Sequence, residues 1–275
     1  MALQEKNKAS KYMETMGLQL WTVRNQLAED QSATLKAVKA AGYKQVELMR
    51  CVGSEEIVKE AKDLGLAVNS SFVEWNSVLQ QGENVPKRKD IVAKAGEYGV
   101  KHLVFGYVGK GSRETVDLMK NCAAKANEFG KMCNDAGIKL CYHNHSFEFA
   151  PVDGKTTGFD VLMNELDNDL CKLELDVFWV KIGGWDPFET MKKLDGRITQ
   201  VHLKDLKKGS EVNHDEGTVP HECFEELGDG TIDMQKTLEM AEEVGAEYCH
   251  VEQDQSADPI ASIGQSMGHL KSFGG

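Results

Sequence analysis

The sequence predicts a single α/β domain folded as a (β/α)8 TIM barrel with eight parallel strands. Short β-rich runs alternate with longer helical patterns along the whole chain, eight such runs are present, and no linker interrupts them. Alternation of strands and helices is typical of a parallel sheet whose strands are joined by crossover helices. Eight such units in one uninterrupted chain therefore predict one closed barrel.

The expected strands are short, and the first begins at residue 16. We expect residues 1–15 to form an N-terminal extension and residues 16–275 to form the barrel domain. The eight strands are predicted at residues 16–21, 45–49, 67–72, 102–107, 139–145, 171–177, 198–205 and 246–254.

The segments between these runs carry the signals of helices. Leu35, Val38 and Ala41 recur at helical spacing, and a glycine follows that pattern at once. Glycine supplies the left-handed residue that ends a helix before the next strand begins. The same signal stands at Gly42, Gly65, Gly99, Gly137 and Gly245. An open doubly wound sheet would need a phosphate-binding glycine loop after the first strand, and the sequence LQLWTVRNQLAED has none.

Composition excludes several classes of partner. A chain of 275 residues with 41% hydrophobic side chains can bury a large core without disulfides. The net charge of −12 and the absence of a basic cluster longer than Lys87-Arg88-Lys89 argue against nucleic acid. Seven scattered cysteines without a CxxC pair indicate buried thiols of a reducing compartment.

The amino-terminal sequence MALQEKNKASKYMETM is charged and lacks the apolar run of a signal peptide. No stretch approaches the roughly 18 apolar residues that would span a bilayer. We therefore expect a soluble, cytoplasmic protein without a membrane partner; the sequence is compatible with a homo-oligomer.

Four successive strands, the fifth to the eighth, end with a side chain that can bind metal: His143, Asp176, His202 and Glu252. The carboxyl ends of barrel strands carry the active site, and strand alternation aims these side chains at one point. Each residue alone is also compatible with a hydrogen-bonded core polar group, but the four together predict a metal centre. Two imidazoles with two carboxylates suit Mn, Zn, Co or Fe better than Mg or Ca, so we expect one divalent metal ion.

Other polar residues near the strand ends are candidates for binding substrate or for a structural role. Lys204 shares a face with His202, so it either binds a substrate oxygen or leaves the rim paired with Asp205. Glu47 either touches substrate or is a simple rim charge. Glu174 lies one pair deeper than the strand end, where we expect a buried structural hydrogen bond.

Two further features leave alternatives open. Tryptophans at or just after strand ends either stack on the C–H face of a sugar or pack the loops; they are Trp21, Trp75, Trp179 and Trp185. Residues 206–231 form the longest connection and are rich in acidic and histidine side chains. This segment is a lid, a subunit contact or a solvated loop.

The phrases around these residues resemble the sugar phosphate isomerase/epimerase family of xylose isomerase-like TIM barrels. GLQLWTVRNQLAED and TLKAVKAAGYKQVELM resemble that family's opening, and YHNHSFEF, LELDVFWVKIGGWDP, GRITQVHLKD and YCHVEQD resemble its second half. The resemblance runs from about residue 16 to the end. It implies one divalent metal at the ends of strands five to eight and proton transfer beside a sugar carbonyl.

The resemblance implies that Asp176, His202 and Glu252 occupy metal-ligand positions. At the fifth strand, ketose epimerases of the family have a glutamate, whereas this chain offers His143. In those epimerases two metal-bound glutamates act as opposed acid and base, so this chain keeps only Glu252 of the pair.

For the second proton carrier, the local candidates are His145 and Glu148, although Glu148 is also suited to hydrogen-bonding substrate hydroxyls. Trp179 stands where such epimerases often have a substrate-binding histidine. We count it among the expected substrate-binding residues, with Lys204 and Glu47.

The predicted activity is isomerisation or epimerisation of a small sugar or keto-sugar through an enediolate, with that sugar as the small-molecule partner. A cation stabilises the enediolate as it forms, and a carboxylate moves the proton. The alternatives are a metal-dependent lyase or hydrolase on oxidised glycosides and a non-catalytic sugar-binding barrel. A DNA-repair endonuclease, from a related branch, is disfavoured by the negative charge and by the single ligand per strand.

Overall fold

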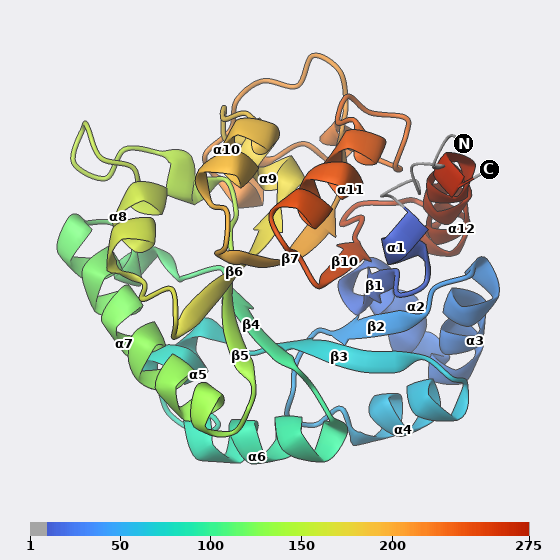
Figure 1. Ribbon diagram of the computed structural model, residues 1–275, viewed down its shortest axis with the longest axis horizontal. Coiled ribbons are helices and arrows are strands. Elements are labelled where there is room, and N and C mark those ends of the chain that lie inside the picture. The colour runs from blue at the N-terminus through green and yellow to red at the C-terminus, as the bar shows by residue number, and fades with distance from the viewer. Residues whose placement is uncertain (1–9, 275) are drawn as a thin grey trace, which may run out of the picture.

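The predicted barrel is present in the computed structural model, which describes residues 10–274 (Figure 1). All eight predicted strands occur, and they close into a parallel barrel. In order around the barrel they are β1 (Gly17–Gln19), β10 (Tyr248–Val251), β7 (Ile198–Leu203), β6 (Cys171–Asp176), β5 (Lys139–His143), β4 (His102–Gly106), β3 (Ala67–Phe72) and β2 (Gln45–Leu48).

Helices surround the strands on the outside of the barrel (Figure 1). Leu35 and Val38, predicted to face the core, are fully buried in α3. The five predicted helix-ending glycines all adopt left-handed backbone angles, with φ between +69° and +116°. The helices are α1 (Ser10–Met13), α2 (Arg24–Glu29), α3 (Gln31–Ala41), α4 (Glu55–Asp63), α5 (Trp75–Leu79), α6 (Arg88–Tyr98), α7 (Val116–Asp135), α8 (Gly158–Glu165), α9 (Val177–Ile182), α10 (Pro187–Lys193), α11 (Met234–Glu243) and α12 (Pro259–Lys271).

Several strands are shorter than predicted: β1 ends at Gln19, β10 ends at Val251, and β7 ends at Leu203, where the chain leaves the barrel. Asp205 begins β8 (Asp205–Leu206), which pairs antiparallel with β9 (Phe224–Glu225) outside the barrel. The Asp205 carboxylate accepts backbone N–H bonds from Gly228, Gly230 and Ile232 at 2.9–3.1 Å. Asp205 therefore anchors the segment 206–231 and is not the ion partner of Lys204.

The interior of the barrel is polar at mid-height, whereas branched apolar residues dominate the usual TIM-barrel interior. The Glu47 carboxylate accepts hydrogen bonds from Gln19 Nε2 at 2.7 Å and Ser70 Oγ at 2.5 Å. Gln200 Nε2 donates both to Ser70 Oγ and to Glu174 Oε1, at 3.1 Å each. This layer links β1, β2, β3, β6 and β7 directly beneath the carboxyl ends of the strands.

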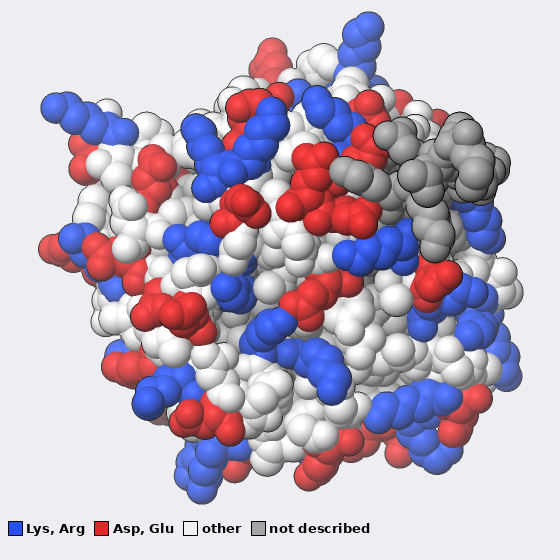
Figure 2. All heavy atoms as spheres, in the orientation of Figure 1, with Lys and Arg blue, Asp and Glu red and all other residues white. Residues whose placement is uncertain are grey.

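The seven cysteines are buried and free. Acidic and basic side chains are interspersed on the face shown in Figure 2. Within residues 10–274, no helix is long and apolar enough to cross a membrane. The predicted boundary at residue 16 stays a prediction: residues 1–9 of the expected extension lie outside the described residues, and Tyr12 packs into the core with its hydroxyl donating to Ala246 O at 2.8 Å.

Two helical glycines differ in the space around them and provide a stability test. An added Cβ at Gly130 in α7 would overlap the carbonyl oxygen of Leu170, whereas at Gly96 in α6 it would meet nothing within 4 Å. Overpacking typically costs about 1–3 kcal/mol, and replacing an exposed helical glycine by alanine gains up to about 1 kcal/mol. We expect Gly130→Ala to lower the free energy of unfolding and Gly96→Ala to raise it in urea titrations. Equal effects of the two substitutions would contradict this packing.

Candidate metal centre and active site

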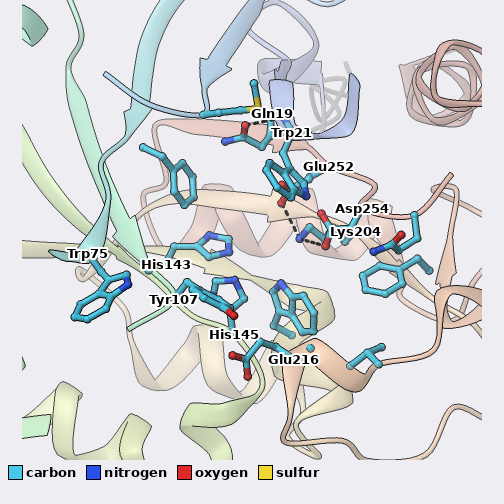
Figure 3. Close-up of a pocket in the computed structure, with 18 of the residues that line it drawn as sticks. Gln19, Trp21, Trp75, Tyr107, His143, His145, Lys204, Glu216, Glu252 and Asp254 are labelled. Atoms are coloured by element: carbon cyan, nitrogen blue, oxygen red, sulfur yellow. Dashed lines mark hydrogen bonds and ion pairs between the residues drawn. The ribbon is translucent and has the colours of Figure 1, made fainter. Parts of the chain in front are cut away.

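A cavity of about 700 Å³ opens at the carboxyl ends of the strands (Figure 3). The second half of the barrel contributes most of its polar side chains, and the first half contributes several aromatic ones. Residues from the segment 206–231 close one side, so this segment is a wall of the cavity and not a plain solvated loop. The residues that line the cavity include Trp21, Trp75, Tyr107, His143, His145, Trp179, Lys204, Glu216, Glu252 and Asp254.

The structure brings the four predicted metal ligands together. Their ligand atoms all lie within 4.8 Å of one another, and all four residues are buried. Asp176 stands opposite His202 in the β6–β7 register, and His202 Nδ1 lies 2.9 Å from Glu252 Oε2. His143 Nε2 lies 3.8 Å from Asp176 Oδ2. The predicted convergence of strands five to eight is therefore present in the geometry.

The two carboxylate oxygens of Asp176 have different roles: one caps a helix, and the other lies in the ligand cluster. Oδ1 accepts the backbone N–H of Trp179 at 3.0 Å and caps α9. Oδ2 has no hydrogen-bond partner among the described residues, although it is completely buried. Burial raises the pKa of this carboxyl, and Lys204 and His202 act against that rise. A buried carboxylate oxygen that makes no hydrogen bond among the described residues, and that stands beside two imidazoles with the Lys204 ammonium group 3.2 Å away, fits a divalent cation.

Lys204 lies within the site and not at the rim (Figure 3). Its Nζ is 2.7 Å from Glu252 Oε2, 3.2 Å from Asp176 Oδ2 and 3.0 Å from Asp254 Oδ2. Burial alone would lower the pKa of Lys204, but the three carboxylates raise it well above its usual value. Lys204 is therefore a fixed cation that shares two carboxylates with the candidate metal centre.

Glu252 is ionised at neutral pH. Burial alone would raise its pKa, but Lys204 and His202 outweigh burial and lower the pKa to about 2. Both contacts use Oε2, so the second carboxylate oxygen is not engaged in them. An ionised carboxylate on the wall of the cavity is suited to accept a proton from a bound substrate.

The two histidines of the fifth strand end are neutral. Burial lowers the pKa of His143 well below its usual value and that of His145 to about 3. Their rings lie 5.0 Å apart, and His145 also stands 5.3 Å from the Trp179 ring. His145 Nδ1 has no hydrogen-bond partner among the described residues. His145 is thus an uncharged ring whose Nδ1 is available to hydrogen-bond a substrate.

Glu47, expected at the rim, does not line the cavity. It is fully buried in the polar layer, where His202 Nε2 lies 2.7 Å from its Oε2. Burial alone would raise its pKa, but His250 and His202 lower it. The side chain is placed to act on His202 and not on substrate directly. Glu174 is likewise fully buried, so the expected structural hydrogen bond is present.

Glu148 does not line the cavity either; it lies in the short 3-10 turn of residues 147–149 and is fully buried. It accepts the Tyr142 hydroxyl at 2.5 Å and the His145 backbone N–H at 3.0 Å. Burial raises the pKa of Glu148 to about 8. Its contacts hold the backbone of His145, and they do not place the carboxyl beside a substrate carbon.

Three of the four tryptophans are placed where they can contact a sugar, and the fourth packs within the loops. Trp21, Trp75 and Trp179 line the cavity, and 46% of the Trp21 side-chain surface is exposed. Trp179 presents a buried ring N–H without a hydrogen-bond partner among the described residues. Trp185 instead packs against Phe149 and Phe159, with ring centroids 5.1 and 5.8 Å away.

Sequence reasoning missed three residues that complete the site. Asp254 could have been found, because it lies two residues after Glu252 and shares its face of the strand end. Glu216 reaches the cavity from the segment 206–231, where a 2.7 Å ion pair with the buried Arg113 holds it. Glu216 Oε2 has no hydrogen-bond partner among the described residues and faces this wall. No local pattern signals this pair, since its members are 103 residues apart.

Fold and site together define a barrel with a metal-competent centre at its carboxyl face, and comparison with known proteins identifies its family. The chain belongs to the xylose isomerase-like TIM barrel family, whose model matches residues 35–273.

The chain is similar to an inosose dehydratase of Clostridium perfringens, with 33% identity over 162 residues that cover 55% of this chain and 54% of the relative. It therefore spans about half the length of that curated relative. A sugar phosphate isomerase/epimerase structure from Parabacteroides distasonis has a TM-score of 0.77 at 23% identity and covers 94% of this chain and 98% of its own. The IolI protein, solved with a zinc atom, has a TM-score of 0.68 at 14% identity, with 94% and 98% covered. These two structures share the fold.

The raised pKa of Glu148 predicts a pH-dependent stability. Its pKa is about 8 in the folded protein against an ordinary value of 4.5, so between these values the folded protein keeps a proton that the unfolded chain has lost. The free energy of unfolding then falls as pH rises, by up to about 1.4 kcal/mol per pH unit. We expect Glu148→Gln to lose less stability than the wild type between about pH 5 and pH 8 in urea titrations.

The exposed Glu114→Gln variant is the control and should keep the wild-type pH slope. Parallel slopes for the wild type and Glu148→Gln would contradict the burial of an uncharged carboxyl behind His145.

Proposed function

We propose that the protein is a divalent-metal-dependent lyase that eliminates water, or another β-substituent, from a keto-sugar. The observation that carries this proposal is the pairing, within the candidate ligand set, of one glutamate at the cavity wall, Glu252, with a neutral histidine, His143, at the fifth strand end. Epimerisation through two opposed glutamates needs a second metal-bound carboxylate at that position. Elimination needs one base to remove the proton beside the carbonyl and one acid for the leaving oxygen.

The ligands of the metal would be His143, Asp176, His202 and Glu252. Their donor set of two nitrogens and two carboxylate oxygens suits Zn, Mn, Co or Fe. When bound, the cation stabilises negative charge that develops on the carbonyl oxygen of the substrate. The zinc atom bound by the structurally similar IolI protein supports a metal in this chain.

The chain's own residues supply the proton transfers. Glu252 takes the proton from the carbon beside the carbonyl, and the electron pair of that C–H bond passes to the carbonyl oxygen. The resulting enediolate re-forms the carbonyl and breaks the bond to the β-oxygen, which leaves with a proton. Lys204 is a protonated donor 2.7 Å from Glu252 and is placed to supply that proton. The acid and the base are thus neighbours on one wall, as elimination from one face requires.

The cavity favours an uncharged sugar over a sugar phosphate. Lys204 is the sole lysine or arginine among the lining residues of the described chain, and three carboxylates already pair with it. A phosphate dianion would lose hydrating water on entering the cavity and would lie close to the negative charges of Glu216, Glu252 and Asp254. Both effects are unfavourable. Unpaired polar atoms of His145, Trp179 and Glu216 are instead suited to hydroxyl groups, and exposed Trp21 is suited to C–H faces.

A second candidate is epimerisation or isomerisation of the same keto-sugar. It follows if Lys204, in place of a second glutamate, delivers the proton to the substrate carbon. The two activities share the first proton transfer and differ in its outcome. The similarity to an inosose dehydratase supports elimination, and the similarity to a sugar phosphate isomerase/epimerase supports the second candidate.

Metal content tests the centre with two histidines that lie two residues apart. We expect the purified protein to bind one Zn²⁺ or Mn²⁺ per chain, and His143→Gln to reduce this content by at least about tenfold, because an N ligand is lost. His145 lines the cavity but is not among the proposed ligands, so His145→Gln should keep the full metal content. Elemental analysis after identical dialysis gives the comparison. Equal metal content in both variants would contradict the proposed ligand set.

Reaction in D₂O separates the two activities. With an inosose as test substrate, we expect loss of water and a product with an absorbing conjugated carbonyl, followed by ultraviolet absorbance and NMR. Glu252→Gln should slow this reaction by about 100-fold or more, because the proton acceptor is lost. Trp185→Phe, which lies outside the cavity, should react at the wild-type rate. If the substrate instead takes up deuterium at the epimerised carbon and loses no water, the elimination proposal is wrong and epimerisation is the activity.

A further inference from the structure

Two carboxylates lie directly beneath the candidate metal centre without lining the cavity. Glu47 on β2 and Glu174 on β6 are both 0% exposed. The imidazoles of His143 and His202 stand between these carboxylates and the site above. Each imidazole has two ring nitrogens, and a neutral ring can donate from one while the other binds a metal.

His143 directs one ring nitrogen to each side. Its Nδ1 lies 3.1 Å from Glu174 Oε2, within hydrogen-bond distance. Its Nε2 faces the candidate centre, 3.8 Å from Asp176 Oδ2. The acceptor behind the ring therefore favours the tautomer with the proton on Nδ1 and leaves the Nε2 lone pair for a metal.

His202 is turned the opposite way. Its Nε2 lies 2.7 Å from Glu47 Oε2 and 3.2 Å from Glu174 Oε2. Its Nδ1 faces the centre, 2.9 Å from Glu252 Oε2 and 3.9 Å from Asp176 Oδ2. The two histidines thus offer different ring nitrogens to the same point.

We propose that Glu47 and Glu174 are positioning residues that fix the two histidines in opposite tautomers, so that a metal is bound by His143 through Nε2 and by His202 through Nδ1. This inference rests on the metal centre proposed above. Carboxylates behind metal-binding histidines orient the ring and increase its basicity, and their loss typically weakens metal binding about 10- to 100-fold.

The two carboxylates are themselves held in place. Glu47 accepts hydrogen bonds from Gln19 and Ser70, and Glu174 accepts one from Gln200. These donors come from strands on both sides of the barrel. The acceptors therefore cannot rotate away from the imidazoles without breaking the polar layer, which gives the ring orientations a rigid support.

A competing arrangement uses some of the same atoms. Glu47, Glu174, His202 and His250 also bring four ligand atoms within 4.8 Å of one another, deeper in the barrel. A metal there would use Nε2 of His202, whereas the proposed centre uses Nδ1, so a neutral His202 ring serves one site only. The identity of the coordinating nitrogen distinguishes the two arrangements.

The first test uses the unmodified protein. ¹⁵N-histidine NMR spectra of the Zn²⁺-loaded protein report which ring nitrogen carries the proton, and His143→Gln and His202→Gln assign the signals. The proposal predicts a protonated Nδ1 in His143 and a protonated Nε2 in His202. Coordination of His202 through Nε2, or the same tautomer in both rings, would overturn it.

The second test measures Zn²⁺ affinity by competition with a chelator. Glu47→Gln and Glu174→Gln keep the side-chain shape but replace one acceptor oxygen behind the rings by an amide NH₂ group, which only donates, so we expect Zn²⁺ binding about 10- to 100-fold weaker. His250→Gln lies in the same layer without a hydrogen bond to either ligand and should bind Zn²⁺ as the wild type does. Circular dichroism checks that each variant is folded.

The outcomes separate the two proposals. Wild-type affinity in both folded glutamate variants overturns the positioning role and leaves the metal centre intact. Loss of Zn²⁺ binding in His250→Gln places the ion in the deeper cluster and overturns the proposed tautomers. Absence of Zn²⁺ binding by the wild-type protein overturns the metal centre itself and, with it, the positioning role.

Discussion

The structure of the site depends on the position of one imidazole, that of His202, among four buried carboxylates. Its ring nitrogens lie 2.7 Å from Glu47, 3.2 Å from Glu174, 2.9 Å from Glu252 and 3.9 Å from Asp176. Buried carboxylates are costly unless they are paired and hydrogen-bonded. Burial alone would lower the pKa of His202, but Glu174, Glu47 and Glu252 raise it well above its usual value, so a metal at Nδ1 would have to displace a proton from the ring. This one side chain therefore joins the polar interior of the barrel to the cavity above it, and cations at the site compete with it for the same oxygens.

Lys204, at the wall of the cavity, is likewise a buried cation that pairs with several carboxylates. It shares Glu252 and Asp176 with His202 and adds Asp254, which the centre does not need for its ligand set. Burial raises the pKa of Asp254 to about 6, with Lys204 acting against that rise. A divalent cation that takes over Glu252 and Asp176 leaves Asp254 as the remaining partner of the ammonium group. With this extra carboxylate, the lysine and a bound divalent cation would each have a counter-ion within one buried site.

Sequence reasoning predicted the features that depend on short-range periodicity. The strands and the glycine-ended helices follow from local patterns, and the convergence of His143, Asp176, His202 and Glu252 follows from strand ends meeting at one face of a barrel. Glu47 and Glu148 were placed less well, because the sequence does not show how deep a side chain lies below the rim or to which side a short turn directs it. The Arg113–Glu216 pair and the anchoring of the segment 206–231 by Asp205 could not be predicted, since each joins groups far apart in the chain.

The histidine at position 143 has a consequence for the whole site. A glutamate there would add another negative charge beside Glu174, whose Oε2 lies 3.1 Å from His143 Nδ1, and two such carboxylates would repel each other. A neutral imidazole instead donates to Glu174 and still offers a lone pair to a metal. His143 therefore stabilises the buried polar layer, but it does not supply a second carboxylate proton carrier opposite Glu252. The residue at position 143 therefore affects both the buried polar layer and the proton carriers near the centre. A site built in this way fits the proposed elimination, in which Glu252 removes a proton and Lys204, on the same wall, supplies one to the leaving oxygen.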